Sequence, residues 1–113
     1  MTSSTTEWGS RTAHLRERLP EHLDELTGPI TGTVELPVHL AWSGLRAFDL
    51  DEPKLLLGMY RIVIGSGLHE DITTYLSAGL LRQHWPVLRR MLSKAVRAVW
   101  EEHFPELRPA AAA

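Results

Sequence analysis

The segment from Val87 to His103 constrains the fold of this 113-residue chain most strongly, because its apolar residues recur at the spacing of a single helix face. Pro86 stands at its first turn and Pro105 bounds its end. A helix with so wide an apolar face has to bury it against other apolar elements. The segment therefore predicts helices packed around one core, and the residues expected on its inner face are Leu88, Met91, Leu92, Ala95, Val96, Val99 and Trp100.

Two earlier stretches have the same helical spacing. In residues 11–27 four leucines form one stripe, and Pro20 inside it predicts a kink or two abutting helices. Residues 53–64 begin after Asp51, which can cap a helix because its side chain accepts hydrogen bonds from free backbone amides. The composition of residues 58–68 leaves a strand as the alternative there. Further short helices are expected, at residues 70–76 and 78–84.

Residues 30–48 follow a different pattern, with weak alternation and frequent glycine and proline. We interpret residues 31–37 and 38–42 as two short strands or extended segments. The predicted fold class is mainly α, with four to five helices around one core. The alternative includes in addition a short two-stranded element near residues 33–42.

Composition bounds the class of protein. The chain has no cysteine, which excludes disulfides and thiolate chemistry. Its first residues lack the apolar core of a signal peptide, and no apolar run is long enough to span a bilayer. We expect a cytoplasmic protein with no membrane partner. Residues 1–9 are predicted to be a disordered N-terminus, residues 10–108 a single helical domain and residues 109–113 a disordered tail.

The sequence contains no recognisable catalytic or cofactor motif. Gly65-Ser66-Gly67 is similar to the start of a dinucleotide-binding fingerprint, but Glu70 occupies the place of the third glycine, and its charge would repel a pyrophosphate. None of the six histidines lies three or four residues from another, the spacing that brings two metal ligands to one helix face. We therefore expect no enzyme, no catalytic residues, no cofactor and no metal site.

Basic residues gather in the second half of the chain. Residues 54–113 hold five acidic and eight basic residues, whereas residues 1–53 hold nine acidic and four basic ones. On the predicted last helix, Arg90, Lys94 and Arg97 share one face. That face is either an ordinary solvated surface, a docking site for an acidic protein, or a contact for nucleic acid.

A second candidate surface lies near the predicted strands. Trp42, Arg46 and Phe48 are in or beside loops. Aromatic residues of small domains are commonly core. If these are exposed instead, they have the composition of an interface hot spot. The expected partner-binding residues are therefore Trp42, Arg46, Phe48, Arg90, Lys94 and Arg97.

Short segments spread over about residues 27–108 carry a family resemblance. They are Thr27-Gly28-Pro29, Val34-Glu35-Leu36-Pro37, Leu40-Ala41-Trp42-Ser43, Phe48-Asp49-Leu50-Asp51-Glu52-Pro53, Met59-Tyr60, Tyr75-Leu76, Leu81 to Pro86, Val96 to Glu101 and Phe104-Pro105-Glu106-Leu107. Together they resemble a group of small, uncharacterised actinobacterial proteins, often encoded beside nucleotidyltransferase toxins of the abortive-infection type. The resemblance implies an antitoxin-like or accessory role in a toxin–antitoxin system, and it assigns no functional residues.

The function expected from these observations is that of a non-catalytic protein-interaction module. It would restrain a cognate nucleotidyltransferase toxin by steric or electrostatic masking. The alternative is a small DNA-binding transcriptional regulator that uses the basic C-terminal helix, so nucleic acid is the less favoured partner. A homo-oligomer is a further alternative, which the sequence neither favours nor excludes.

Overall fold

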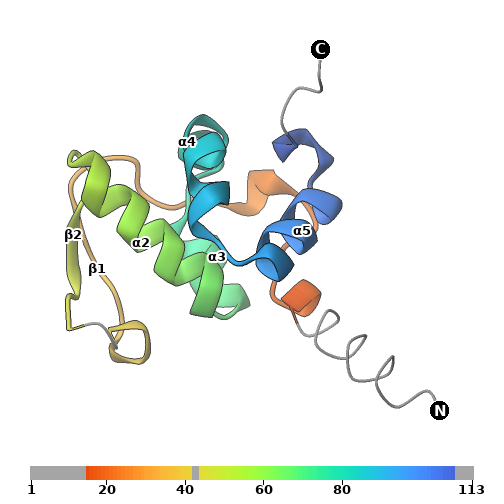
Figure 1. The fold of residues 1–113 in the computed structure, drawn as a ribbon. Coiled ribbons are helices and arrows are strands. Elements are labelled where there is room, and N and C mark those ends of the chain that lie inside the picture. Colours follow the sequence, from red (N-terminus) through yellow and green to blue (C-terminus); the bar gives the residue numbers. More distant parts are fainter. Residues whose placement is uncertain (1–14, 42–43, 109–113) are drawn as a thin grey trace.

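The structure, a computed structural model, describes residues 15–41 and 44–108 and has a mainly α fold with one small sheet (Figure 1). This confirms the predicted fold class. In chain order the elements are η1 (Leu23–Glu25), β1 (Thr33–Glu35), η2 (Val38–Leu40), β2 (Ala47–Asp49), α2 (Pro53–Ser66), α3 (His69–Tyr75), α4 (Ala78–Met91), α5 (Lys94–His103) and η3 (Pro105–Leu107), where η denotes a short 3-10 helix.

Helix α2 lies at the centre of the fold. It contacts α3, α4, β2 and η2, with the β1–β2 ribbon on one side and α4 on another (Figure 1). Five of its side chains are buried, namely Leu56, Met59, Tyr60, Val63 and Ile64. Pro53 opens the helix, where its missing N–H costs no hydrogen bond. The predicted helix over residues 53–64 is thus confirmed, and the strand alternative for residues 58–68 is wrong because the helix continues to Ser66.

The chain before β1 is joined to the junction between α3 and α4. Thr27 and Ser77 form an isolated antiparallel bridge, and the backbone N–H of Gly28 donates to the Leu76 carbonyl over 2.8 Å. The Tyr60 hydroxyl accepts a hydrogen bond of 2.9 Å from the Ser77 backbone, which fixes this junction against α2. Burial raises the pKa of Tyr60, so its hydroxyl stays neutral in this position.

The sheet uses a different second strand from the one predicted. β1 pairs antiparallel with β2, with Val34 opposite Phe48, whereas residues 38–40 form the 3-10 turn η2. Val34 and Phe48 are both buried, so the register brings two apolar side chains to the core side of the ribbon. The alternation in residues 38–42 was misleading because Pro37 precedes a tight turn there.

Two predicted helices have different boundaries. In the described part of residues 11–27, the chain is α-helical only at residues 15–17. The helix breaks before Pro20, and only the 3-10 helix η1 follows. The predicted helix from Val87 to His103 is two helices, because α4 extends from Ala78 through Pro86 to Met91 and α5 begins anew at Lys94. Ser93 caps α5, since its side chain accepts a hydrogen bond of 3.3 Å from the Val96 backbone. The predicted helix over residues 70–76 is confirmed as α3.

We predict that Gly28→Ala destabilises the fold by about 1–3 kcal/mol, because a Cβ at this position would lie 2.5 Å from the Tyr75 carbonyl carbon. Gly65→Ala is the matched control. Nothing lies within 4 Å of a Cβ at Gly65, and alanine favours a helix over glycine by up to about 1 kcal/mol. Denaturant unfolding of both variants measures the difference, and equal free energies of unfolding would contradict the close packing at Gly28.

Candidate functional site

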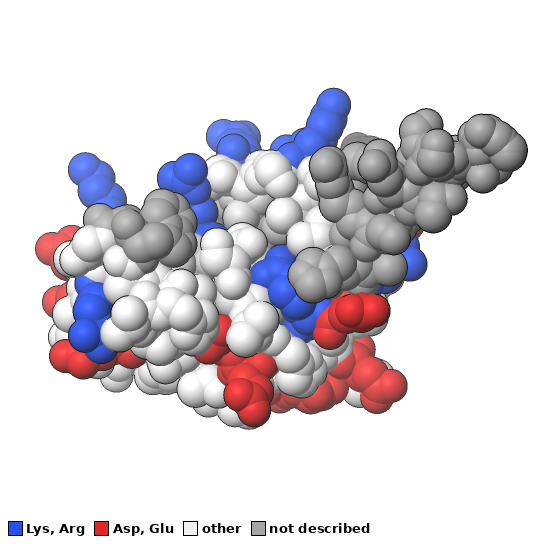
Figure 2. All heavy atoms as spheres, turned by 90° about the horizontal axis from the view of Figure 1, so that it is seen from below, with Lys and Arg blue, Asp and Glu red and all other residues white. Residues whose placement is uncertain are grey.

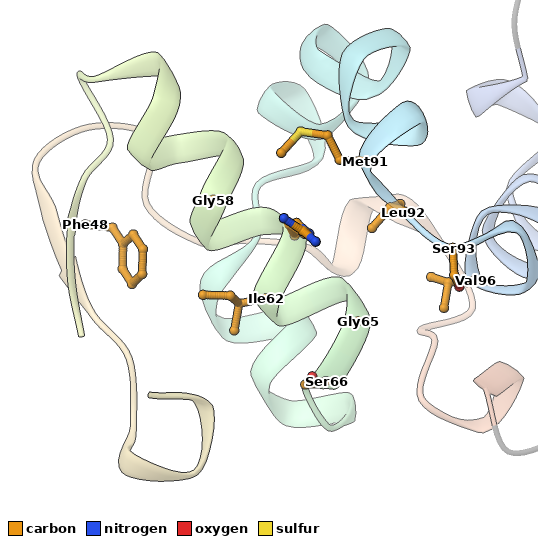
Figure 3. A pocket seen from close by; sticks show the side chains of 10 residues that line it. Phe48, Gly58, Ile62, Gly65, Ser66, Met91, Leu92, Ser93 and Val96 are labelled. Carbon is orange, nitrogen blue, oxygen red and sulfur yellow. Dashed lines mark hydrogen bonds between the residues drawn. The ribbon is translucent and has the colours of Figure 1, made fainter. Parts of the chain in front are cut away.

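A groove of about 660 Å³ opens between α2 and the junction of α4 with α5. We call it the α2 groove. Figure 3 shows Phe48 at one end of it and Leu92, Ser93 and Val96 at the other. Its lining is mostly apolar and comes from β2, α2, the end of α4 and the start of α5: Phe48, Gly58, Arg61, Ile62, Gly65, Ser66, Met91, Leu92, Ser93 and Val96.

The α2 wall is the helix face that points away from the core. Gly58, Arg61, Ile62 and Gly65 follow one another at helical spacings of three, one and three residues, so their side-chain directions converge on one face. No side chain projects from this face at the two glycine positions. A Cβ at Gly65 would meet nothing within 4 Å, and one at Gly58 would reach only the ring of Phe48, at 4.0 Å. The wall therefore lets another chain approach the backbone of α2 closely.

The opposite wall exists because α4 and α5 are separate helices. Leu92 and Ser93 connect them in extended conformation, and the Ser93 cap starts α5 in a new direction. Met91, Leu92 and Val96 are only half-buried here, so apolar surface stays open to the groove. A single continuous helix would have carried these three side chains along one straight stripe instead.

A polar cluster centred on Glu101 holds α5 against α4. Its carboxylate accepts hydrogen bonds from Trp85 Nε1 at 2.8 Å and from Arg89 Nε at 2.6 Å. Beside it, the buried rings of Trp85 and Trp100 stack with centroids 6.1 Å apart. The hydrogen bond from Arg89 holds the pKa of Glu101 below its ordinary value of 4.5, although partial burial opposes this shift. These contacts fix the angle between α4 and α5, and with it the width of the groove.

The groove is flanked by cations and lacks acids. None of its ten lining residues is acidic, and no Asp or Glu occurs in residues 53–69 or 72–100, which supply both helical walls. Arg61 lines the groove, Lys54 lies on the same face of α2, and Arg90 and Lys94 are sequence neighbours of lining residues. All four are exposed, and the described residues form no ion pair with them.

Charged side chains are unevenly distributed over one face of the molecule. On the face drawn in Figure 2, basic side chains project mainly along the upper edge and acidic ones gather mainly along the lower edge. Two of the acids that remain near the helical core are already engaged, since Glu101 is paired with Arg89 and Glu102 with Arg16. The groove walls therefore present no carboxylate that would oppose recognition of an acidic partner.

The predicted basic residues do not lie on a single helix. Arg90 is in the last turn of α4, whereas Lys94 and Arg97 belong to α5, so the expected shared helix face is wrong. The reason is the break at Leu92 and Ser93, which the apolar periodicity conceals. Arg97 is half-buried and its guanidinium donates to the Arg89 carbonyl over 3.4 Å, so part of its charge serves the end of α4.

The structure also changes the interpretation of the candidate surface predicted at Trp42, Arg46 and Phe48. Phe48 is only 2 % exposed and packs in the core beneath α2, so it cannot be an exposed hot spot. It lines one end of the groove instead. Arg46 is exposed, donates to the Leu36 carbonyl over 3.3 Å, and does not line the groove. Trp42 lies outside the described residues.

Sequence reasoning missed most of the α2 wall. The partner-binding residues expected from the sequence include none of Gly58, Arg61, Ile62 and Gly65. The signal was present in the combination of Gly58, Arg61 and Gly65, since two glycines and a cation on one face of a helix cannot be that helix's core side. For the wall formed by Leu92 and Ser93, the only indication in the sequence is Ser93 itself, because serine commonly caps the start of a helix.

The lining determines what the groove can do chemically. It offers apolar contact, one guanidinium and two hydroxyls, and no carboxylate or imidazole that could move a proton. Among residues 15–41 and 44–108 no three His, Asp or Glu side chains come together as a metal site would require. Within the same ranges no helix has the length and apolar character needed to cross a bilayer.

Comparisons of the chain with protein-family models, with curated proteins and with solved structures gave no match. Its function is therefore argued from the groove itself.

We predict that Glu101→Gln lowers the free energy of unfolding by about 1 kcal/mol near pH 7, because the charge-assisted hydrogen bonds from Arg89 are weakened. The folded-state pKa of Glu101 is depressed, so the stabilisation is present above 4.5 and is lost as the pH falls through the folded-state pKa. The gap between the variant and the parent chain should therefore close in acid.

Denaturant unfolding near pH 7 and at about pH 3 measures this gap. Glu102→Gln is the control, because the ion pair of Glu102 with Arg16 is on the surface and contributes little. A gap for Glu101→Gln that is the same at both pH values would show that the carboxylate charge does not hold α5 in place.

Proposed function

We propose that this chain is a non-catalytic protein-interaction module that docks a partner protein in the α2 groove. The observation that carries the proposal is an open, largely apolar groove whose lining holds one arginine and no acid, and the described residues form no ion pair with that arginine. Half-buried apolar side chains next to an exposed arginine are the composition of a protein-binding surface. Recognition of a helix in a groove is a common way of using such a surface.

The geometry favours a protein partner over nucleic acid. A nucleic-acid surface needs cations that track successive phosphates, and here the predicted basic face is divided between α4 and α5. The groove is lined by the half-buried side chains of Ile62, Leu92 and Val96, which gain free energy by contact with apolar side chains and not with phosphates. Cations at its margins then provide orientation and a faster encounter with an acidic partner.

For the partner, we propose a nucleotidyltransferase toxin encoded beside the gene, as the family resemblance implies. Masking would follow from occupation of the groove by a segment of the toxin, which holds this chain over the toxin's acidic, metal-dependent active site. Arg90 and Lys94 are exposed next to the groove and available to meet such acids. The function then needs no chemistry from this chain, only a stable complex.

We predict that the chain co-purifies with the neighbouring nucleotidyltransferase when the two are co-expressed, and that it restores growth to cells that the toxin arrests. Gly65→Leu should abolish both effects, because nothing lies within 4 Å of a Cβ at this lining position and a leucine there would occupy space in the groove. Gly79→Leu is the matched control, since Gly79 is exposed on α4 and does not line the groove.

Absence of both co-purification and rescue would contradict the proposed function. Equal loss in Gly65→Leu and Gly79→Leu would separate the function from the groove. Binding to duplex DNA that weakens steeply with salt and is lost in Arg90→Ala, with no binding to the toxin, would instead support a regulator.

A further inference from the structure

We propose that the segment seated in the α2 groove is an amphipathic, acidic α-helix of the partner, with a carboxylate that pairs with Arg61. This inference rests on the proposed function and specifies the chemistry of the occupant. It follows from three properties of the groove, which are its apolar floor, the position of Arg61 within the lining and the helical backbone of its α2 wall.

The apolar floor sets the size of the occupant's contact. The wall from Gly58 to Gly65 comprises eight residues and extends about 10 Å along α2, which is about two helical turns. Ile62, Leu92 and Val96 face this length from both sides and are each half-buried. A helix that presents apolar residues at positions i, i+3, i+4 and i+7 covers such a stretch with one face.

Arg61 sets the charge of the occupant. Its guanidinium is exposed and lines the groove, and none of the described residues forms an ion pair with it. A partner that covers the groove removes water from this charge. Desolvation without an opposite charge is costly, so an occupant that lacks a carboxylate here would bind weakly. The walls cannot provide one, because residues 53–69 and 72–100 contain no acid.

The α2 wall favours a helix over an extended peptide. An extended occupant has to satisfy its own backbone N–H and C=O groups by pairing with a free strand edge. The α2 wall is a helix whose backbone groups are hydrogen-bonded within it, so it offers no such edge. A helical occupant satisfies its own backbone groups. Gly58 and Gly65 then allow its axis to come near that of α2, because neither of these two positions carries a Cβ.

Three synthetic helical peptides of equal length test the inference against the full chain. The first has leucines at i, i+3, i+4 and i+7 flanked by glutamates, the second has lysines in place of the glutamates, and the third keeps the glutamates but has serines in place of the leucines. Titration into isotope-labelled protein is followed by backbone NMR. We expect shifts concentrated at Gly58, Arg61, Gly65 and Val96 with the first peptide, and binding about tenfold tighter than with the second. The third should not bind.

A charge swap makes the test independent of folding defects. Arg61→Glu should reverse the order of the first two peptides, because the lysine peptide then provides the complementary charge. Gly65→Leu should block both peptides, and Gly79→Leu neither. Equal binding of the acidic and basic peptides, an unchanged order in Arg61→Glu, or shifts outside the groove would each overturn the inference.

The same titration with duplex DNA and with vesicles of anionic lipid distinguishes other sources of negative charge. Binding of either one at the groove, with none by the acidic peptide, would overturn the inference. Failure of the inference is distinguishable from failure of the proposed function. If the toxin co-purifies and Gly65→Leu prevents it, while no preference for acid is found, only the assigned chemistry of the occupant falls.

Discussion

Helix α2 has to meet two opposite environments with fourteen residues, and the rest of the fold is arranged around that requirement. One face is buried against the sheet, α3 and α4. Its C-terminal end is covered by Arg18, whose guanidinium donates to the carbonyls of Ile64 and Gly67. Burial lowers the pKa of Arg18, so these carbonyls, at the negative end of the helix dipole, offset part of the cost of placing a cation there. With its core face and its end both occupied, α2 has only its outer face available to a partner.

The groove results from two local features, the glycines on the outer face of α2 and the break between α4 and α5. At positions 58 and 65 of α2, glycine projects no side chain into the groove. Each glycine lowers the stability of the helix by up to about 1 kcal/mol relative to alanine. Ser93 ends one helix and starts the next, so that Met91, Leu92 and Val96 surround open space instead of closing on α2. The Glu101 cluster holds the second helix in this position. The Glu101 cluster therefore contributes both to the stability of the fold and to the shape of the groove.

The sequence predicted the mainly α class and the position of α2, because a strong apolar periodicity reports burial directly. It did not predict the break at Leu92, since the stripe of apolar residues continues across it and only the capping ability of Ser93 marks the boundary. Nor did it predict that β2 begins at Ala47, because pairing of three-residue strands depends on tertiary packing. Phe48 shows the same limit, since an aromatic residue beside a loop has no local sign that distinguishes core from surface. Groove residues such as Arg61 need the three-dimensional arrangement of two helices that are separated along the chain.

The central claim is that the partner lies against the outer face of α2. Because the chain has no cysteine, a single one can carry a short photo-crosslinker to a chosen place. We would attach it at Gly65→Cys, inside the groove, and at Gly79→Cys, on the exposed surface of α4. The account predicts a covalent adduct with the co-expressed partner from the first position and little or none from the second. An adduct from Gly79→Cys alone, or equal yields from both positions, would contradict it.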